Sequence, residues 1–211
     1  MAKDGIMELN ISLKRIVANA TFVVLSMNIV LVVGSWVLAA VCPGISLRTI
    51  LGNDGLRWLF GSYVSNICSP VLVWLVLAGV SIGAVSDSRL AHAVCNLRQT
   101  TYYERMALLV VLWEIIGIAA VIVVLAFVPH AILLSALGTY LPSSFSASIV
   151  PVLAVSSCLS AVTYGSITSS FHSVSDVFDS LSRGIGLVAP YIILYIVMTE
   201  FYYSLRWVMM L

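Results

Sequence analysis

The sequence predicts an all-α integral membrane protein, with about five transmembrane helices and short interfacial helices in a single domain over residues 1–211. The first observation is composition: 61% of the residues are hydrophobic and only 9% are charged, whereas soluble domains carry about 25% charged residues. The second is a mean hydropathy of +1.10. The third is the division of the chain into apolar runs of about 20 residues, the length that crosses a bilayer as a helix.

Five runs are long and apolar enough to span, and we place them at residues 16–41, 66–85, 106–128, 148–165 and 185–206. Three other stretches are shorter or more amphipathic. Residues 47–60 predict two short amphipathic pieces broken by Gly52-Asn53-Asp54-Gly55. Residues 131–140 predict an interfacial or re-entrant piece, and residues 169–183 predict a surface helix.

Positive charge predicts the orientation, because cytoplasmic loops of membrane proteins are enriched in Lys and Arg. A cytoplasmic N-terminus leaves only Arg48, Arg57 and Arg206 outside and puts seven basic residues inside: Lys3, Lys14, Arg15, Arg89, Arg98, Arg105 and Arg183. We therefore expect a multi-pass protein of the inner cell membrane with its C-terminus outside. The polar start precedes a run too long for a secretory signal and without a small-residue cleavage site, so we expect the first span to be retained.

Several classes of function are disfavoured by what the sequence does not contain. The net charge is +1 and no basic run is interleaved with aromatic residues, so nucleic acid is not an expected partner. No Ser/His/Asp or paired-carboxylate arrangement has catalytic spacing, so we do not expect an enzyme. No cofactor is expected. The cysteines show no CxxC or His spacing, so we interpret them as isolated thiols and expect no metal site; they are Cys42, Cys68, Cys95 and Cys158.

The C-terminal half of the chain resembles the AbgT family of p-aminobenzoyl-glutamate transporters. In that family an Ile-Val-Pro opens a helix that carries Tyr-Gly near its end, and the next helix carries Ala-Gln-Phe and Asn-Trp. The corresponding positions here are Ile149-Val150-Pro151, Tyr164-Gly165, Thr199-Glu200-Phe201 and Arg206-Trp207. Upstream, "ERMALLVVLWEIIGIAAVIVVLAFVPHAILLSALG", "DGLRWLFGSYVSNICSP" and "LVLAGVSIGAVSDSRL" resemble further family segments in the same order.

The resemblance implies a shortened member that keeps scaffold-like helices. Family members are more than twice as long and carry a re-entrant hairpin and broken helices where this chain has only "LAHAVCNLRQTTYY". Their second hairpin would follow Trp207, and we expect it to be missing because the sequence stops at Leu211. The retained segments are those that in the family form the scaffold and the dimer contact. The family activity therefore does not carry over directly, because transporters commonly bind solute and ion on discontinuous helices.

Two carboxylates are candidates for transport chemistry. Glu114 lies within the third span, where an ionisable side chain must face the protein interior and find a partner. It is either a proton-titrating group or a hydrogen-bonded contact between helices. Glu200 stands where the family has Gln, and its alternative role is in an interfacial polar cluster with Tyr203 and Arg206.

Hydroxyl groups and glycines mark two further helix faces. Ser156, Ser160 and Thr163 follow an i, i+4, i+7 spacing, so they share a face that either packs on another helix or lines a permeation path. Gly79 and Gly83 form a GxxxG pair, which allows close helix packing either within one chain or in a dimer.

Three hypotheses follow for the function. The first is a small AbgT-like transporter, a secondary transporter of a small organic solute that works as a homodimer in the lipid bilayer. The second is a transport-incompetent membrane scaffold or subunit derived from the dimerisation part of the family. The third is a chain whose missing hairpins come from a separate membrane subunit.

Overall fold

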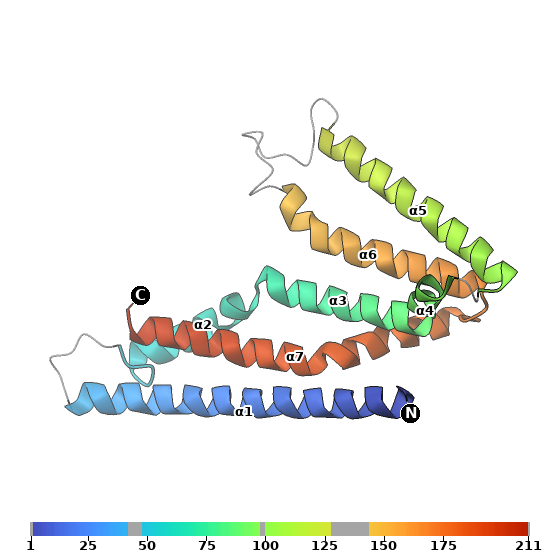
Figure 1. The fold of residues 1–211 in the computed structure, drawn as a ribbon. Coiled ribbons are helices and arrows are strands. Elements are labelled where there is room, and N and C mark those ends of the chain that lie inside the picture. The colour runs from blue at the N-terminus through green and yellow to red at the C-terminus, as the bar shows by residue number, and fades with distance from the viewer. Residues whose placement is uncertain (1, 42–47, 98–99, 128–143, 211) are drawn as a thin grey trace. The chain divides into compact units, whose positions relative to one another are not determined.

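The computed structural model describes the backbone of residues 2–41, 48–97, 100–127 and 144–210, and within these the side chains of 12–41, 48–97, 100–124 and 148–210. These segments form seven α-helices and no strand, which confirms the all-α prediction (Figure 1). The helices are α1 (Ala2–Val41), α2 (Asn53–Ile67), α3 (Pro70–Asp87), α4 (Leu90–Cys95), α5 (Tyr102–Phe127), α6 (Ser144–Ile167) and α7 (Val174–Val208).

Five of these helices are long and apolar enough to cross a membrane, as predicted. The spanning segments are Ser12–Val41, Pro70–Asp87, Tyr102–Val124, Ser148–Ile167 and Val174–Val208. The boundaries move by up to four residues from the predicted ones except at the start of the last span. The chain is therefore a multi-pass membrane protein.

The separate surface helix predicted at residues 169–183 is wrong, because its second part is the beginning of α7. The helix starts at Val174, where Ser173 Oγ accepts a hydrogen bond from Asp176 N at 3.2 Å and the Asp176 carboxylate accepts one from Ser173 N at 3.0 Å. This reciprocal capping fixes the start. Pro190 does not interrupt the helix. At about 1.5 Å per residue α7 exceeds the roughly 30 Å hydrocarbon layer, so its polar first turns extend beyond that layer.

The two amphipathic pieces predicted at residues 47–60 are also wrong. Residues 48–52 form no helix, and α2 begins at Asn53, inside the predicted break. The glycines bracket the helix start instead of separating two helices: Gly52 is the N-cap in an extended conformation, and Leu56 N donates to Gly52 O at 2.9 Å. The piece predicted at 131–140 lies outside the residues that the structure describes.

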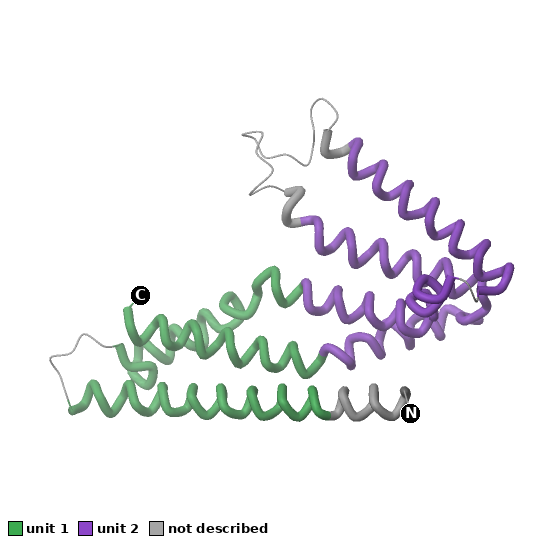
Figure 2. The backbone as a smooth tube through the Cα atoms, in the orientation of Figure 1, with its two compact units in different colours: residues 1–73, 189–211 green, residues 74–188 purple. Residues whose placement is uncertain are grey.

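The helices group into two compact units (Figure 2). Unit 1 comprises Met1–Val73 and Ala189–Leu211, and unit 2 comprises Trp74–Val188. Unit 1 thus holds α1, α2 and the C-terminal part of α7. Unit 2 holds most of α3, all of α4, α5 and α6, and the N-terminal part of α7.

Glycines bring α3 and α7 into close contact within unit 2. A Cβ atom on Gly83 would collide with Ser180 O and lie 2.7 Å from Gly184 Cα, and one on Gly79 would lie 3.2 Å from Gly184 O. Ser180 Oγ crosses the contact and donates to Gly83 O at 3.0 Å. Of the two alternatives for the GxxxG pair, the structure shows the intramolecular one, because Gly184 occupies the face that a second copy would need.

In unit 1 a tyrosine supports the break between α2 and α3. Cys68 and Ser69 are not helical, since Pro70 cannot donate a backbone hydrogen bond and opens the next helix. Tyr195 OH donates to Ile67 O at 3.3 Å and is hydrogen-bonded to Ser69 Oγ. The hydroxyl is therefore a second donor to Ile67 O, which also accepts a hydrogen bond from Ser69 N at 2.7 Å.

Candidate transport site

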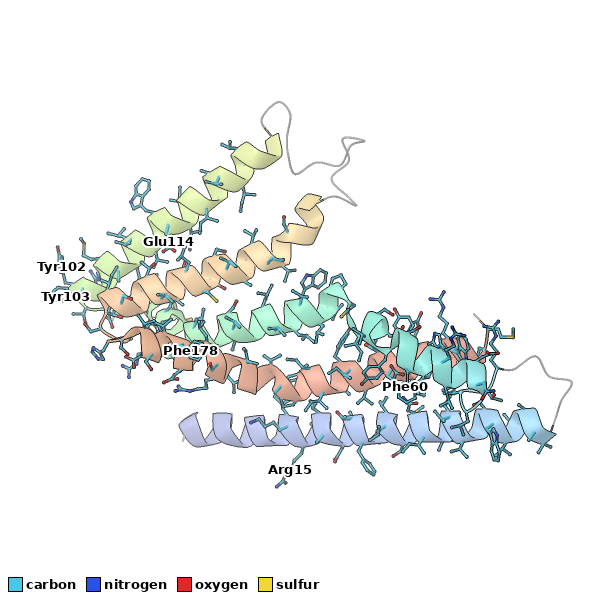
Figure 3. All side chains as sticks on the ribbon, turned by 180° about the vertical axis from the view of Figure 1, so that it is seen from behind. Arg15, Phe60, Tyr102, Tyr103, Glu114 and Phe178 are labelled. Atoms are coloured by element: carbon cyan, nitrogen blue, oxygen red, sulfur yellow. The ribbon has the colours of Figure 1, made fainter. Side chains whose placement is uncertain are left out.

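The α5 helix turns one buried stripe toward α6. Ala107 is fully buried and Val111 is 5% exposed, and Glu114 and Ile118 continue the stripe as half-buried residues at three- and four-residue spacing. This spacing keeps all four on one side of the helix. Figure 3 shows Glu114 on the side of α5 that faces α6.

The facing surface of α6 carries Tyr164 and Ser160, one turn apart. Tyr164 is 1% exposed and packs with Ala107 and Val111 in the core of unit 2. The two helices run in opposite directions (Figure 1). The next turn of α5 after Val111, which carries Glu114, therefore faces the turn of α6 that precedes Tyr164, which carries Ser160. Glu114 and Ser160 are therefore at the same level of the α5–α6 pair.

Both of these polar groups are buried without a hydrogen-bond partner. Oε1 and Oε2 of Glu114 and Oγ of Ser160 are shielded from solvent, and none has a partner among the residues that the structure describes. A partner for Glu114 was predicted, and this part of the chain provides none. Leaving a buried polar group unsatisfied costs about 1–3 kcal/mol. The arrangement thus places an uncompensated acid at the helix interface, where a proton or a solute group can be bound.

The three hydroxyls of the predicted face of α6 differ in their surroundings. Ser156 Oγ donates to Val152 O at 2.7 Å and to Leu153 O at 3.2 Å, so its hydroxyl is satisfied by its own helix. Thr163 is half-buried. Only Ser160, at 2% exposure, is fully enclosed.

Helix α6 also packs on α3 through polar groups that sequence reasoning did not identify. Ser81 Oγ donates to Leu77 O at 2.9 Å and to Ala154 O at 3.1 Å, and Cys158 Sγ lies 3.7 Å from Ser81 Oγ. The sequence signal was a lone serine in an apolar span, which is typical of an interhelical hydrogen bond. Small polar groups therefore hold α6 from a second side.

Glu200 belongs to unit 1 and does not join the predicted polar cluster with Arg206. Residues six apart on a helix point in different directions, because each residue advances the helix by about 100°. Both carboxylate oxygens are buried without a partner. Glu200 lines a cavity of about 530 Å³ with Asn28, Tyr63 and Ser204, whose remaining lining is apolar and includes Phe60, labelled in Figure 3.

The cysteines that the structure describes are unpaired. Cys68, Cys95 and Cys158 are free thiols, and Cys42 lies outside the described ranges. Within those ranges no group of three or more His, Cys, Asp or Glu side chains lies close enough to hold a metal ion.

Comparison with known proteins gave one family. The sequence model described as the AbgT putative transporter family matches residues 58–210, which cover both carboxylates, the hydroxyl-bearing α6 and the glycine contact. No curated protein and no solved structure matched the chain.

Proposed function

The chain belongs to the AbgT putative transporter family, and on this premise we propose that it carries a small organic solute across the membrane by secondary transport, as a homodimer. Family membership and the five apolar helices support membrane transport in general. The solute class, the coupling and the dimer are the proposal.

The observation that carries the proposal is the unpartnered Glu114 carboxylate in the α5–α6 interface, at the level of the unpartnered Ser160 hydroxyl. Ionisable side chains inside membrane spans are costly, and they mark proton relays and solute paths. A Glu with a purely structural role would be expected to make hydrogen bonds that offset the free-energy cost of burying its carboxyl group. In the proposal Glu114 gains and loses a proton during transport, and the Ser160 hydroxyl is positioned at the same level to hydrogen-bond the carboxyl group or a passing solute.

The homodimer is supported by the large share of span surface that is exposed in the single chain. No more than 28% of the residues in any spanning window are buried, so one chain encloses little of its own span surface. The Gly79 and Gly83 face is already used within the chain, so the proposed contact lies on other faces of the bundle. Mass measurement in nanodiscs tests this part, and a monomer at all protein concentrations contradicts it.

Reconstitution of the purified chain into liposomes tests transport. Uptake of radiolabelled p-aminobenzoyl-glutamate, the solute suggested by the family resemblance, is measured together with internal pH under an imposed pH gradient. The expected result is uptake that depends on the gradient in the wild type and is lost in Glu114→Gln, which keeps the side-chain size and removes the titratable carboxyl group. Asp179→Asn is the matched control, because Asp179 is an exposed carboxylate on α7 and its loss should leave uptake unchanged.

Two outcomes would contradict this proposal. Gradient-dependent uptake that survives Glu114→Gln removes Glu114 from the mechanism. Absence of both solute uptake and proton movement with a folded, reconstituted chain favours the transport-incompetent scaffold. Co-purification of a stoichiometric hydrophobic protein would instead favour a separate membrane subunit.

A further inference from the structure

A polar cavity lies in unit 1 where α7 ends. It measures about 460 Å³, and no acidic residue lines it. Two arginines, two tryptophans, an asparagine and a tyrosine contribute to the lining: Arg48, Arg206, Trp58, Trp207, Asn66 and Tyr203. These groups favour an anionic ligand, because every charge in the lining is positive and the arginine and tryptophan side chains can donate hydrogen bonds but cannot accept them.

Two of the donors are buried without partners. Asn66 is 8% exposed, and its Nδ2 makes no hydrogen bond to any residue that the structure describes. Trp207 Nε1 is also buried and makes no hydrogen bond to any residue that the structure describes. Asn66 and Trp207 both line the cavity. Because buried N–H groups are nearly always paired in folded proteins, two unpaired donors on residues that line one cavity point to an acceptor that comes from outside the chain.

The tryptophans and Arg48 are held in a fixed arrangement around these donors. The Trp58 and Trp207 rings stack with centroids 4.8 Å apart and planes at 15°. The Arg48 guanidinium lies over the Trp207 ring, 5.0 Å from its centroid, and Arg48 N donates to Val208 O at 3.3 Å. A guanidinium stacked on a ring keeps its N–H edge available for an oxyanion.

We propose that this cavity binds the phosphate group of an anionic phospholipid. Arginine pairs bidentately with phosphate, and the buried N–H groups of Asn66 and Trp207 supply further donors to its oxygens. The position selects a lipid as the source, since Arg206 and Trp207 lie in the last turns of a spanning helix. Lipid headgroups and tryptophan side chains meet at this depth of a membrane. The inference does not depend on transport, because it uses none of the residues of the α5–α6 interface.

The neighbouring cavity provides an internal comparison. It measures about 630 Å³ and shares Arg48 and the tryptophan pair, but it adds Asp54 along with Arg57. The Asp54 carboxylate would repel a phosphate. Arg57 therefore offers the same charge on the same part of unit 1 without lining the cavity that we assign to the lipid.

Native mass spectrometry of the purified full chain, titrated with phosphatidylglycerol, tests the assignment. Phosphatidylcholine measures the preference for an anionic lipid, and inorganic phosphate measures binding of the free anion. Arg48→Gln removes an exposed charge and should weaken phosphatidylglycerol binding about tenfold, the effect of losing a charge-assisted hydrogen bond. Asn66→Asp keeps the side-chain size, replaces a donor by a negative charge and should abolish the bound lipid. Arg57→Gln should change binding less than twofold.

The possible results either support the phospholipid site or overturn it. Selective binding of phosphatidylglycerol that falls in Arg48→Gln and Asn66→Asp but not in Arg57→Gln supports the site. Equal weakening by Arg48→Gln and Arg57→Gln shows diffuse attraction and overturns it. Equal binding of both lipids, or saturation by inorganic phosphate that displaces the lipid, overturns the lipid assignment. Melting curves of each variant confirm folding, and Arg48→Gln alone suffices if Asn66→Asp does not fold.

Discussion

Replacing Gly184 by Ala should force α3 and α7 apart. A Cβ atom at this position would collide with Gly79 O and lie 2.6 Å from Gly83 N and 2.7 Å from Gly83 Cα. All three are backbone atoms, so no side-chain rotation relieves the overlap. Ordinary contacts of this kind are about 3.5–4.0 Å long, so the helix backbones must separate by about 1 Å.

The expected loss of stability follows from two contributions. Over-packing of a tight contact costs about 1–3 kcal/mol. Separation also stretches the hydrogen bond from Ser180 Oγ to Gly83 O, which is 3.0 Å long and is worth about 0.5–1.5 kcal/mol. Against this, Ala favours a helix interior over Gly by about 1 kcal/mol. The net destabilisation is therefore about 2 kcal/mol.

Gly186 provides the matched control, two residues along the same helix. Nothing lies within 4 Å of a Cβ atom built there, so Gly186→Ala keeps the gain in helix propensity without the overlap. The two variants should differ by roughly 3 kcal/mol. At about 2–4 °C per kcal/mol for a chain of this length, thermal melting in mild detergent should separate their midpoints by roughly 6–12 °C. Equal midpoints would refute the close contact between α3 and α7.

Three further outcomes are expected. Glu114→Leu should leave the melting temperature unchanged or raise it, because the carboxylate has no partner to lose; a drop of several degrees would reveal a contact that stabilises the fold. Tyr195→Phe should destabilise the chain by about 0.5–1.5 kcal/mol, measured by the same melting assay, because Ile67 O and Ser69 Oγ lose a hydroxyl partner; an unchanged midpoint would argue against that bridge. With the other cysteines replaced, the exposed Cys95 should be protected from an impermeant thiol reagent in intact cells if its loop is cytoplasmic, and rapid labelling would reverse the orientation.

The spans were predictable because their signal is local. A run of about 20 apolar residues favours the lipid phase by its own composition and does not depend on contacts with the rest of the chain. The start of α7 was missed because its first part is amphipathic and carries Asp176 and Asp179, whereas only the part from residue 185 onward is apolar enough to indicate a span. In the structure Gly184 is the contact surface for α3, so its small size serves packing and not a turn.

The candidate site was predictable only in part. The energetic cost of an acid in a span was enough to single out Glu114. Its level relative to Ser160 depends on the register of two helices, which local sequence does not specify. The donor-lined cavity was not predicted, because Arg48 and Trp207 are distant in sequence and meet only when unit 1 is folded.

The contact between Gly83 and Gly184 has a consequence for the variation that the two positions can tolerate. Where a large residue packs on a small one, growth on one side can be offset by shrinkage on the other, and the pair changes together over time. Here both residues are glycines, so neither can become smaller to make room for a larger residue at the other position. Each position is constrained alone, and a search for correlated substitutions will find no signal between two residues whose backbones touch.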